Sequence, residues 1–339
     1  MRSALFLHLI MRIDGTTIRG KMGQGQWRLR QAVLCMTSDK FVILDERFAR
    51  LFTSNAQMYR LYTGCRWAEG PAYFPAGRYL IWSDIPNNRM LRYDDCNGEV
   101  SIFRSPSNHS NGNTVDRQGR LVTCEHSGRR ISRTEHDGRI TSIADRHQGK
   151  RLNSPNDVVV KSDGSIWFTD PTYGIDSDYE GEQAESEIGA SHLYRVDPQS
   201  GAIRVVADDF FKPNGLAFSP DEKKLYVADT GRTHGRDLPA HIRVFDVQED
   251  GRLSGGTVLA DCTAGLFDGF RIDDAGRLWS SSAEGIHCIH PDGTLIGKVM
   301  VPEVVSNVCF GGLKRNQLFI CGTTSLYTVH LHVNGARTF

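Results

Sequence analysis

A six-fold internal repeat constrains this chain more than any other feature of its sequence. Each unit opens with a segment that begins near an acidic or amide residue and continues as an apolar strand: AEGPAYF, HSNGNTVD, SPNDVVV, KPNGLAFS, LFDGFRID and VSNVCFG. An apolar segment follows, and then an alternating one that ends in an acidic or glycine turn. In four units a turn glycine stands eight residues after the acidic or amide residue, at Gly77, Gly119, Gly164 and Gly276. Turns of this kind join consecutive antiparallel strands, so each unit predicts a small antiparallel sheet.

The spacing of the units matches one class of repeat fold. Their acidic or amide residues stand at positions 69, 111, 156, 214, 268 and 307, and a four-stranded propeller blade takes roughly 40–45 residues. A fourth strand follows the third in five units, but nothing follows the third strand of the sixth. We predict that residues 57–63 supply it by pairing with residues 325–333, so that N-terminal and C-terminal strands share one blade. The sequence thus predicts an all-β, six-bladed β-propeller with four antiparallel strands per blade over residues 47–339, preceded by a partly ordered N-terminal arm, residues 1–46.

Charge and composition exclude several classes of partner. The 40 basic and 40 acidic residues cancel, so we expect no nucleic-acid partner and no membrane partner. No run approaches the roughly 18 apolar residues of a membrane span. The eight cysteines are scattered without a CxxC pair, which favours free thiols in a reducing compartment and hence a cytoplasmic location. An exported, periplasmic protein stays open as the alternative, because the even cysteine count permits disulfides. The sequence does not indicate an oligomeric state.

The residues that open the six inner strands are expected to converge, because the first strand of each propeller blade lines the central channel. They are two carboxylates and four amides, with no Lys or Arg among them: Glu69, Asn111, Asn156, Asn214, Asp268 and Asn307. The two carboxylates would repel each other unless a cation lay between them. Oxygen ligands of this mixture suit a hard ion such as Ca²⁺ or Mg²⁺. The alternative is that Asn and Asp only cap tight turns, which is their usual role.

At these positions the chain resembles the gluconolactonase/regucalcin (senescence marker protein) family of six-bladed propeller lactonases, on its bacterial gluconolactonase branch. The matching motifs are WAEGP around Glu69, SPND around Asn156, PNGLAFSPD around Asn214 and DGF around Asp268. Diisopropylfluorophosphatase-like hydrolases, which are neighbours in fold, place a Glu, two Asn and an Asp on a catalytic calcium. The resemblance therefore implies one divalent metal ion, Ca²⁺ in the first place with Zn²⁺, Mg²⁺ or Mn²⁺ as alternatives, held by Glu69, Asn156, Asn214 and Asp268.

The reaction that this resemblance implies is the opening of a small lactone, such as a sugar lactone, to the aldonic acid. A metal ion at the channel mouth polarises the lactone carbonyl, and a ligand carboxylate takes the proton of the attacking water. The resemblance favours Asp268 as this base, and Glu69 is the alternative. The chain has no GxSxG nucleophile elbow, so we expect no covalent nucleophile.

Substrate contacts are expected from the ring and from the loops above it. The candidates are Asn111, His126 in the segment CEHSGRR, Tyr173 in the long loop 171–191, and Arg151. Regucalcin has a substrate-binding Arg at the position that Ser154 occupies here, and Arg151 is the candidate to replace it. The loop 171–191 is interpreted either as a lid over the metal or as a solvated surface loop.

Two other functions stay open from the sequence. In one, the same fold and site act on another ester or on an organophosphate. In the other, the propeller is a non-catalytic binding scaffold for protein partners. A scaffold predicts an uncharged axis and exposed aromatic patches on one face, and it leaves Glu69 and Asp268 unexplained.

Overall fold

The structure is a computed structural model that describes residues 11–13, 16–18 and 40–337. The chain divides into two compact units, Met1–Leu34 and Cys35–Phe339. In the first unit the described residues form one antiparallel hairpin, β1 (Met11–Ile13) with β2 (Thr16–Ile18). The second unit contains every other element.

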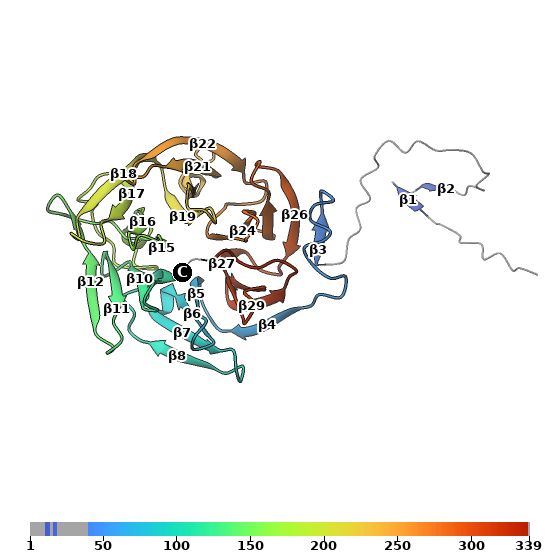
Figure 1. Ribbon diagram of the computed structural model, residues 1–339, viewed down its shortest axis with the longest axis horizontal. Coiled ribbons are helices and arrows are strands. Elements are labelled where there is room, and N and C mark those ends of the chain that lie inside the picture. The colour runs from blue at the N-terminus through green and yellow to red at the C-terminus, as the bar shows by residue number, and fades with distance from the viewer. Residues whose placement is uncertain (1–10, 14–15, 19–39, 338–339) are drawn as a thin grey trace, which may run out of the picture. The chain divides into compact units, whose positions relative to one another are not determined.

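Six antiparallel sheets, five of four strands and one of five, stand around a common axis, which confirms the predicted six-bladed β-propeller (Figure 1). The inner strands are β5 (Ala68–Phe74), β9 (Ser110–Val115), β15 (Val158–Val160), β19 (Pro213–Phe218), β23 (Phe270–Ile272) and β27 (Val305–Gly311). The second strands are β6 (Tyr79–Asp84), β10 (Leu121–Glu125), β16 (Ile166–Asp170), β20 (Lys224–Asp229), β24 (Leu278–Ser282) and β28 (Gln317–Gly322). The third strands are β7 (Arg89–Asp94), β11 (Arg130–Thr134), β17 (Ser191–Val196), β21 (His241–Val247), β25 (Gly285–Ile289) and β29 (Ser325–His330). The outer strands are β8 (Val100–Arg104), β12 (Ile140–Ala144), β18 (Ile203–Phe210), β22 (Leu253–Asp261), β26 (Leu295–Met300) and β4 (Met58–Thr63).

The ring closes where the sequence predicted it. Strand β4, which precedes the first blade in the chain, pairs antiparallel with β29 and completes the sixth blade. Ser325 lies opposite Thr63, and Val329 lies opposite Met58. Strands from the two ends of the propeller therefore share one sheet, which gives the sixth blade its four strands and closes the ring.

A short strand ahead of residue 47 pairs with the fifth blade. Strand β3 (Phe41–Ile43) pairs with the outer strand β26 and makes the fifth blade five-stranded. The Phe41 ring stacks on Phe52, with 4.0 Å between their centroids. Phe48 is fully buried, and the centroids of the Phe48 and Trp279 rings are 6.1 Å apart. This segment therefore packs against the blade core. Three residues of strand are too short to show an alternating pattern, and the sequence therefore gave no signal for β3.

The apolar core lies between neighbouring blades. Trp82, Trp167 and Trp279 are fully buried on second strands of three different blades. All the residues of β5 and β28 are buried, as expected for strands with a neighbouring blade on each face. The seven cysteines within the described residues are unpaired, and all but Cys96 are buried. No helix in the described part of the chain is long and apolar enough to span a membrane.

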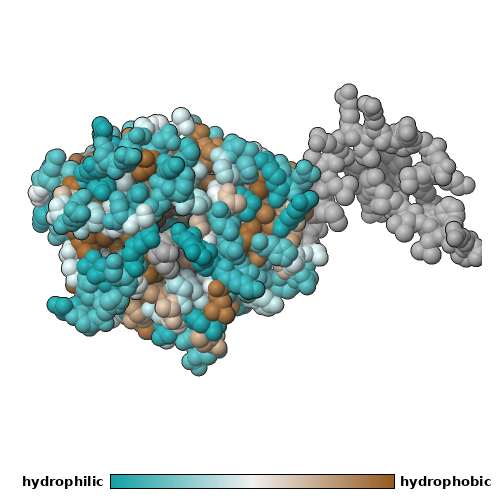
Figure 2. Space-filling model, in the orientation of Figure 1, coloured by the Kyte–Doolittle hydropathy of each residue, from teal (hydrophilic) through white to brown (hydrophobic). Residues whose placement is uncertain are grey.

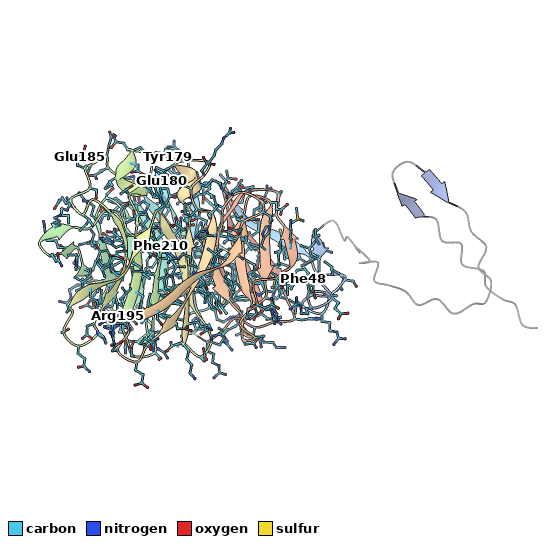
Figure 3. All side chains as sticks on the ribbon, turned by 90° about the horizontal axis from the view of Figure 1, so that it is seen from above. Phe48, Tyr179, Glu180, Glu185, Arg195 and Phe210 are labelled. Atoms are coloured by element: carbon cyan, nitrogen blue, oxygen red, sulfur yellow. The ribbon has the colours of Figure 1, made fainter. Side chains whose placement is uncertain are left out.

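Short elements interrupt the connections within and between blades. The loop between β16 and β17 contains helix α1 (Tyr173–Asp176), and the loop between β20 and β21 contains the 3₁₀ turn η2 (Gly231–Thr233). The 3₁₀ turn η1 (Ile85–Asn87) follows β6, and the hairpin of β13 (Arg146–His147) and β14 (Lys150–Arg151) precedes β15. In Figure 3, the loop residues Tyr179 and Glu180 lie at one end of the propeller, and Arg195 lies at the other.

Candidate active site

The six residues that open the inner strands meet around the axis, at the end of the channel that the long loops cover. We call them the axial ring: Glu69, Asn111, Asn156, Asn214, Asp268 and Asn307. Backbone hydrogen bonds join neighbouring blades at this level: Gly112 N donates to the Asn156 carbonyl at 2.8 Å, and Gly215 N donates to the Asp268 carbonyl at 3.0 Å. The ring closes where Asn307 Nδ2 donates to Glu69 Oε2 at 2.9 Å.

A glycine follows the ring residue in four of the blades, and the close approach of neighbouring strands explains it. A side chain at Gly112 would collide with the Asn156 carbonyl, and one at Gly215 would collide with the Asp268 carbonyl. Only glycine permits backbones to approach this closely. The glycines of the Glu-Gly, Asn-Gly and Asp-Gly pairs therefore allow neighbouring strands to lie close enough for the ring residues to meet.

Buried carboxylates at the ends of second strands fix the chain just ahead of the ring. Asp170 accepts hydrogen bonds from the backbone N–H groups of Asn153 and Ser154, both at 2.9 Å. Asp229 accepts one from Lys212 N at 2.9 Å, two residues before the ring position of its own blade. Burial raises the pKa of Asp170 to about 7. The sequence analysis did not predict that these carboxylates accept backbone hydrogen bonds. The recurring Asp at the end of RYLIWSD, GSIWFTD and KKLYVAD could have indicated it.

The two ring carboxylates occupy different environments. Glu69 is buried, and its Oε2 accepts hydrogen bonds from Asn307 and from Gly70 N. Asp268 is partly exposed. Burial, together with the charges of Asp268 and Asp157, raises the pKa of Glu69 well above its usual value. Burial and nearby carboxylates likewise raise the pKa of Asp268 to about 8. Each of these negative charges is unfavourable without a cation beside it.

The amide oxygens of Asn111, Asn156 and Asn214 accept no hydrogen bond within residues 40–337, whereas that of Asn307 accepts one from Val308 N at 2.8 Å. Asn111 Oδ1 is buried and accepts no hydrogen bond. Asn156 is buried, yet no hydrogen bond involves its side chain within residues 40–337. Asn214 uses its Nδ2 on Thr230 Oγ1 at 3.3 Å. Unpartnered amide oxygens beside two carboxylates are the donors that a hard divalent cation requires, so these residues fit such an ion.

The ring differs from a metal site built of His, Cys or several carboxylates. In the described part of the chain, no group of three or more His, Cys, Asp or Glu side chains could hold a metal ion. The charged pair beneath the ring, Asp157 and Arg271, is already matched, with Nη1 to Oδ2 at 3.3 Å. The negative charges of Glu69 and Asp268 would therefore balance the charge of a cation at the ring.

His126 connects the ring to the long loop of the third blade. It is fully buried, its Nε2 lies 3.1 Å from Asn111 Nδ2, and its Nδ1 lies 2.8 Å from the Glu180 carbonyl. An amide N–H donates and a carbonyl accepts, so the proton is assigned to Nδ1. Burial lowers the pKa of His126 to about 4. The imidazole is therefore neutral near pH 7 and holds Asn111 so that its oxygen stays free.

The two long loops contact each other over this end of the channel. Tyr173 Oη lies 2.8 Å from Thr230 Oγ1 and 2.9 Å from Thr233 Oγ1. Lys212 Nζ lies 3.2 Å from Asp176 Oδ2, which ties the first loop to the start of the fourth blade. These contacts hold the loop 171–190 against the loop between β20 and β21 and against the start of the fourth blade.

Glu180 is a site residue that the sequence did not single out. Burial and the charge of Asp176 raise its pKa to about 7, and its carboxylate in turn raises the pKa of Asp268. The loop that carries it was recognised as rich in acids, but which of those acids turns toward the ring depends on the fold of the loop itself.

Arg151 is not brought to the ring. It lies in β14, where its backbone N–H donates to Glu187 Oε2 at 2.8 Å, and no contact joins it to a ring residue within the described range 40–337. Ser154 donates to the Pro171 carbonyl at 2.7 Å and accepts from Gly174 N at 2.9 Å. Ser154, which stands where regucalcin has its Arg, therefore supports the loop 171–190 in this chain.

Comparisons with known proteins show which proteins this chain is similar to. The chain is similar to a gluconolactonase of Zymomonas mobilis, with 32% identity over 80% of each chain. It is also similar to the pentonolactonase XacC of Haloferax volcanii, with 30% identity over 76% of this chain and 82% of that one. A solved gluconolactonase from Xanthomonas campestris superposes with a TM-score of 0.81 and 39% identity, covering 86% of this chain and 95% of that one.

A family match covers most of the propeller. The family described as SMP-30/Gluconolactonase/LRE-like region matches residues 67–324, which run from the first inner strand to the start of the last third strand. All six ring residues, the long loops and the supporting Asp170 and Asp229 fall within the match. The chain therefore belongs to the SMP-30/gluconolactonase/LRE-like family.

Proposed function

We propose that this chain is a metal-dependent hydrolase that opens a sugar lactone of the gluconolactone type to the aldonic acid. The observation that carries the proposal is the axial ring, which sets two carboxylates among unpartnered amide oxygens beneath a covering loop. Relatives named gluconolactonase and pentonolactonase support a lactone as the substrate.

The residues that would hold one divalent ion are Glu69, Asn156, Asn214 and Asp268. Their oxygens suit Ca²⁺ best, because it accepts carboxylate and carbonyl oxygen in flexible geometry, and Zn²⁺, Mg²⁺ and Mn²⁺ are the alternatives. Once bound, such an ion supplies Lewis-acid polarisation of the lactone carbonyl.

Asp268 is the ring carboxylate best placed to act as the general base. It is partly exposed, whereas Glu69 is buried and accepts hydrogen bonds from Asn307 and Gly70. An exposed carboxylate oxygen can take the proton of an attacking water, while a buried and occupied one holds its position instead. Glu69 is therefore the anchoring carboxylate and the alternative base.

Asn111 is the substrate-binding residue that the geometry supports best, and His126 acts on the substrate through Asn111 as a positioning residue. Asn111 Oδ1 is free to accept a hydrogen bond from a substrate hydroxyl, and His126 fixes its orientation. Tyr173 and Arg151 are weaker candidates, because the Tyr173 hydroxyl already contacts two threonines and Arg151 lies in a separate hairpin.

The test is hydrolysis of D-glucono-δ-lactone, followed by acid release, before chelation, after chelation and after addition of each of the four ions. We expect the enzymatic rate to disappear on chelation and to return with Ca²⁺. An unchanged rate in protein shown by elemental analysis to be free of metal would contradict the proposal. An aryl ester and an organophosphate, assayed beside the lactone, test the substrate class, and faster turnover of either would reassign it.

A further inference from the structure

A cavity of about 370 Å³ lies in the channel away from the axial ring. All six inner strands contribute to its wall through residues that come after the ring positions: Ala72, Val115, Val160, Phe218, Ile272 and Phe310. None of the six ring residues lines it. Because every inner strand runs inward from the ring, these later residues place the cavity toward the opposite end of the channel from the loop 171–190.

Buried polar groups separate this cavity from the ring. Asn113 is fully buried, and its Nδ2 donates to the Gly70 carbonyl and to Ser83 Oγ, both at 2.9 Å. The ion pair of Arg271 and Asp157 crosses the channel at a similar depth. A ligand in the cavity would therefore not reach a metal ion held by the ring.

Two of the arginines at the cavity form no ion pair within residues 40–337. Arg271, Arg315 and Arg337 line it, and only Arg271 forms an ion pair within residues 40–337. The lining carboxylate Glu222 is already paired with Arg117 at 3.5 Å and with Lys161 at 3.3 Å. Burial and the nearby charge of Arg337 lower the pKa of Arg315, while the charge of Asp274 acts in the opposite direction.

The C-terminal segment holds these arginines at the mouth of the cavity. Gly335 N donates to the Arg315 carbonyl at 2.7 Å, and Arg315 Nη1 donates back to the Gly335 carbonyl at 2.7 Å. Ala336 N donates to the Ile272 carbonyl at 2.8 Å, which fastens the segment to the fifth blade. Leu313 lines the same mouth and is 80% exposed. Figure 2 shows hydrophobic surface close to the axis, bordered by hydrophilic residues.

We propose that this cavity binds a medium-chain carboxylate, free in solution, with its apolar chain in the channel and its carboxylate at Arg315 and Arg337. The volume has room for about ten to twelve non-hydrogen atoms at ~30 Å³ each. Removing each methylene group of the chain from water favours binding, and guanidinium groups match a carboxylate through paired N–H donors. A neutral ligand of the same length would leave the two guanidinium charges uncompensated.

Isothermal titration calorimetry of the full chain with decanoate tests the site, with decan-1-ol as the neutral counterpart. We expect one decanoate per chain and at least about tenfold weaker binding of decan-1-ol, since tenfold corresponds to ~1.4 kcal/mol. The double variant Arg315→Gln/Arg337→Gln is expected to weaken decanoate binding about tenfold. Thr114→Phe, which places a ring in the cavity from β9, is expected to abolish it.

Three controls keep the result interpretable. Arg252→Gln removes an exposed arginine that pairs with Asp250 outside the cavity, and it is expected to bind decanoate as the wild type does. Asp268→Asn is also expected to bind normally, because the ring and the cavity are separate. Arg337→Gln alone guards against misfolding of the double variant, since no hydrogen bond or ion pair within residues 40–337 involves the Arg337 side chain; it should still weaken binding severalfold.

Several results would overturn the assignment. They are the absence of saturable binding to the wild type, equal binding of decan-1-ol, wild-type affinity in Thr114→Phe, and loss of binding in Asp268→Asn. The last would place decanoate at the axial ring. The proposed lactone hydrolysis is tested separately by chelation, so either conclusion can fail without the other.

Discussion

At the scale of single residues, the two ring carboxylates have different surroundings, and we propose different roles for them on that basis. Glu69 and Asp268 occupy equivalent repeat positions, and the sequence alone left both open as the base. The structure distinguishes them, because Glu69 is buried with two hydrogen bonds while Asp268 is partly exposed beside Glu180. Residue types and register were predictable from the repeat. Exposure and the approach of Glu180 were not, because they depend on how a twenty-residue loop folds over the ring.

Asp268→Asn tests the assignment of the general base. The variant keeps an oxygen ligand for the ion but cannot take a proton, so we expect kcat to fall about 10²–10⁴-fold. His126→Ala is the comparison, and it is expected chiefly to raise KM, since a contact made equally in ground and transition states leaves kcat unchanged. Steady-state kinetics at saturating metal measure both. Near-normal kcat in Asp268→Asn with loss of kcat in His126→Ala would show that the base has been assigned to the wrong residue.

The buried, neutral His126 also predicts how stability depends on pH. Its pKa falls from an ordinary value near 6.5 to about 4 on folding, so the unfolded chain binds the extra proton between these values. The contribution of His126 is therefore fully present above pH ~6.5 and is lost as the pH falls toward 4, by up to about 3 kcal/mol. His126→Asn keeps a donor for the Glu180 carbonyl but does not titrate.

Urea unfolding at several pH values between 4 and 7 compares the two proteins. We expect the free energy of unfolding to fall less steeply with decreasing pH in His126→Asn than in the wild type. Identical pH dependence would mean that His126 is protonated in the folded protein, and its hydrogen bond to the Asn111 amide would then be wrongly assigned.

At the scale of elements, the regular strands were predictable and the irregular segments were not. Alternating apolar residues and glycine turns define the strands of each blade, and the unmatched sixth outer strand identified β4 as its completion. The strand β3 gave no such signal, because three residues carry no periodicity and their pairing with β26 is a tertiary contact. The carboxylates at the ends of second strands, such as Asp229, recur in the sequence. Their hydrogen bonds to the backbone ahead of the ring were nevertheless not predicted.

Phe48→Ala tests whether the segment around β3 belongs to the propeller. Phe48 is fully buried against Phe52 and Trp279, at centroid distances of 5.2 and 6.1 Å. Removing such a ring typically costs about 3–5 kcal/mol, so we expect a loss of that size in the free energy of unfolding. Leu44→Ala is the matched control, because Leu44 is 39% exposed in the same segment. Equal, small losses in both variants would place the segment outside the cooperative fold.

At the scale of the whole molecule, rotational repetition brings equivalent residues to one axis. This is why the ring could be predicted from six positions spread over residues 69–307 once the blades were recognised. The cavity at the far end of the channel could not, because its volume depends on side chains of different size from six strands and on the C-terminal segment that borders it. The sequence contained the three arginines but not their convergence.

The most direct test of the axial metal is the rate of lactone hydrolysis measured against the number of metal ions added. The protein is first stripped of metal and then held at a concentration well above the dissociation constant while Ca²⁺ is added in small steps. We predict that the rate of D-glucono-δ-lactone hydrolysis rises linearly and stops rising at one ion per chain. Asn156→Ala, which lacks one of the four proposed ligands, should show a shallow rise without that break. A full rate before any ion is added, or no rise with Ca²⁺, Zn²⁺, Mg²⁺ or Mn²⁺, would contradict the assignment of the axial ring as the catalytic metal site.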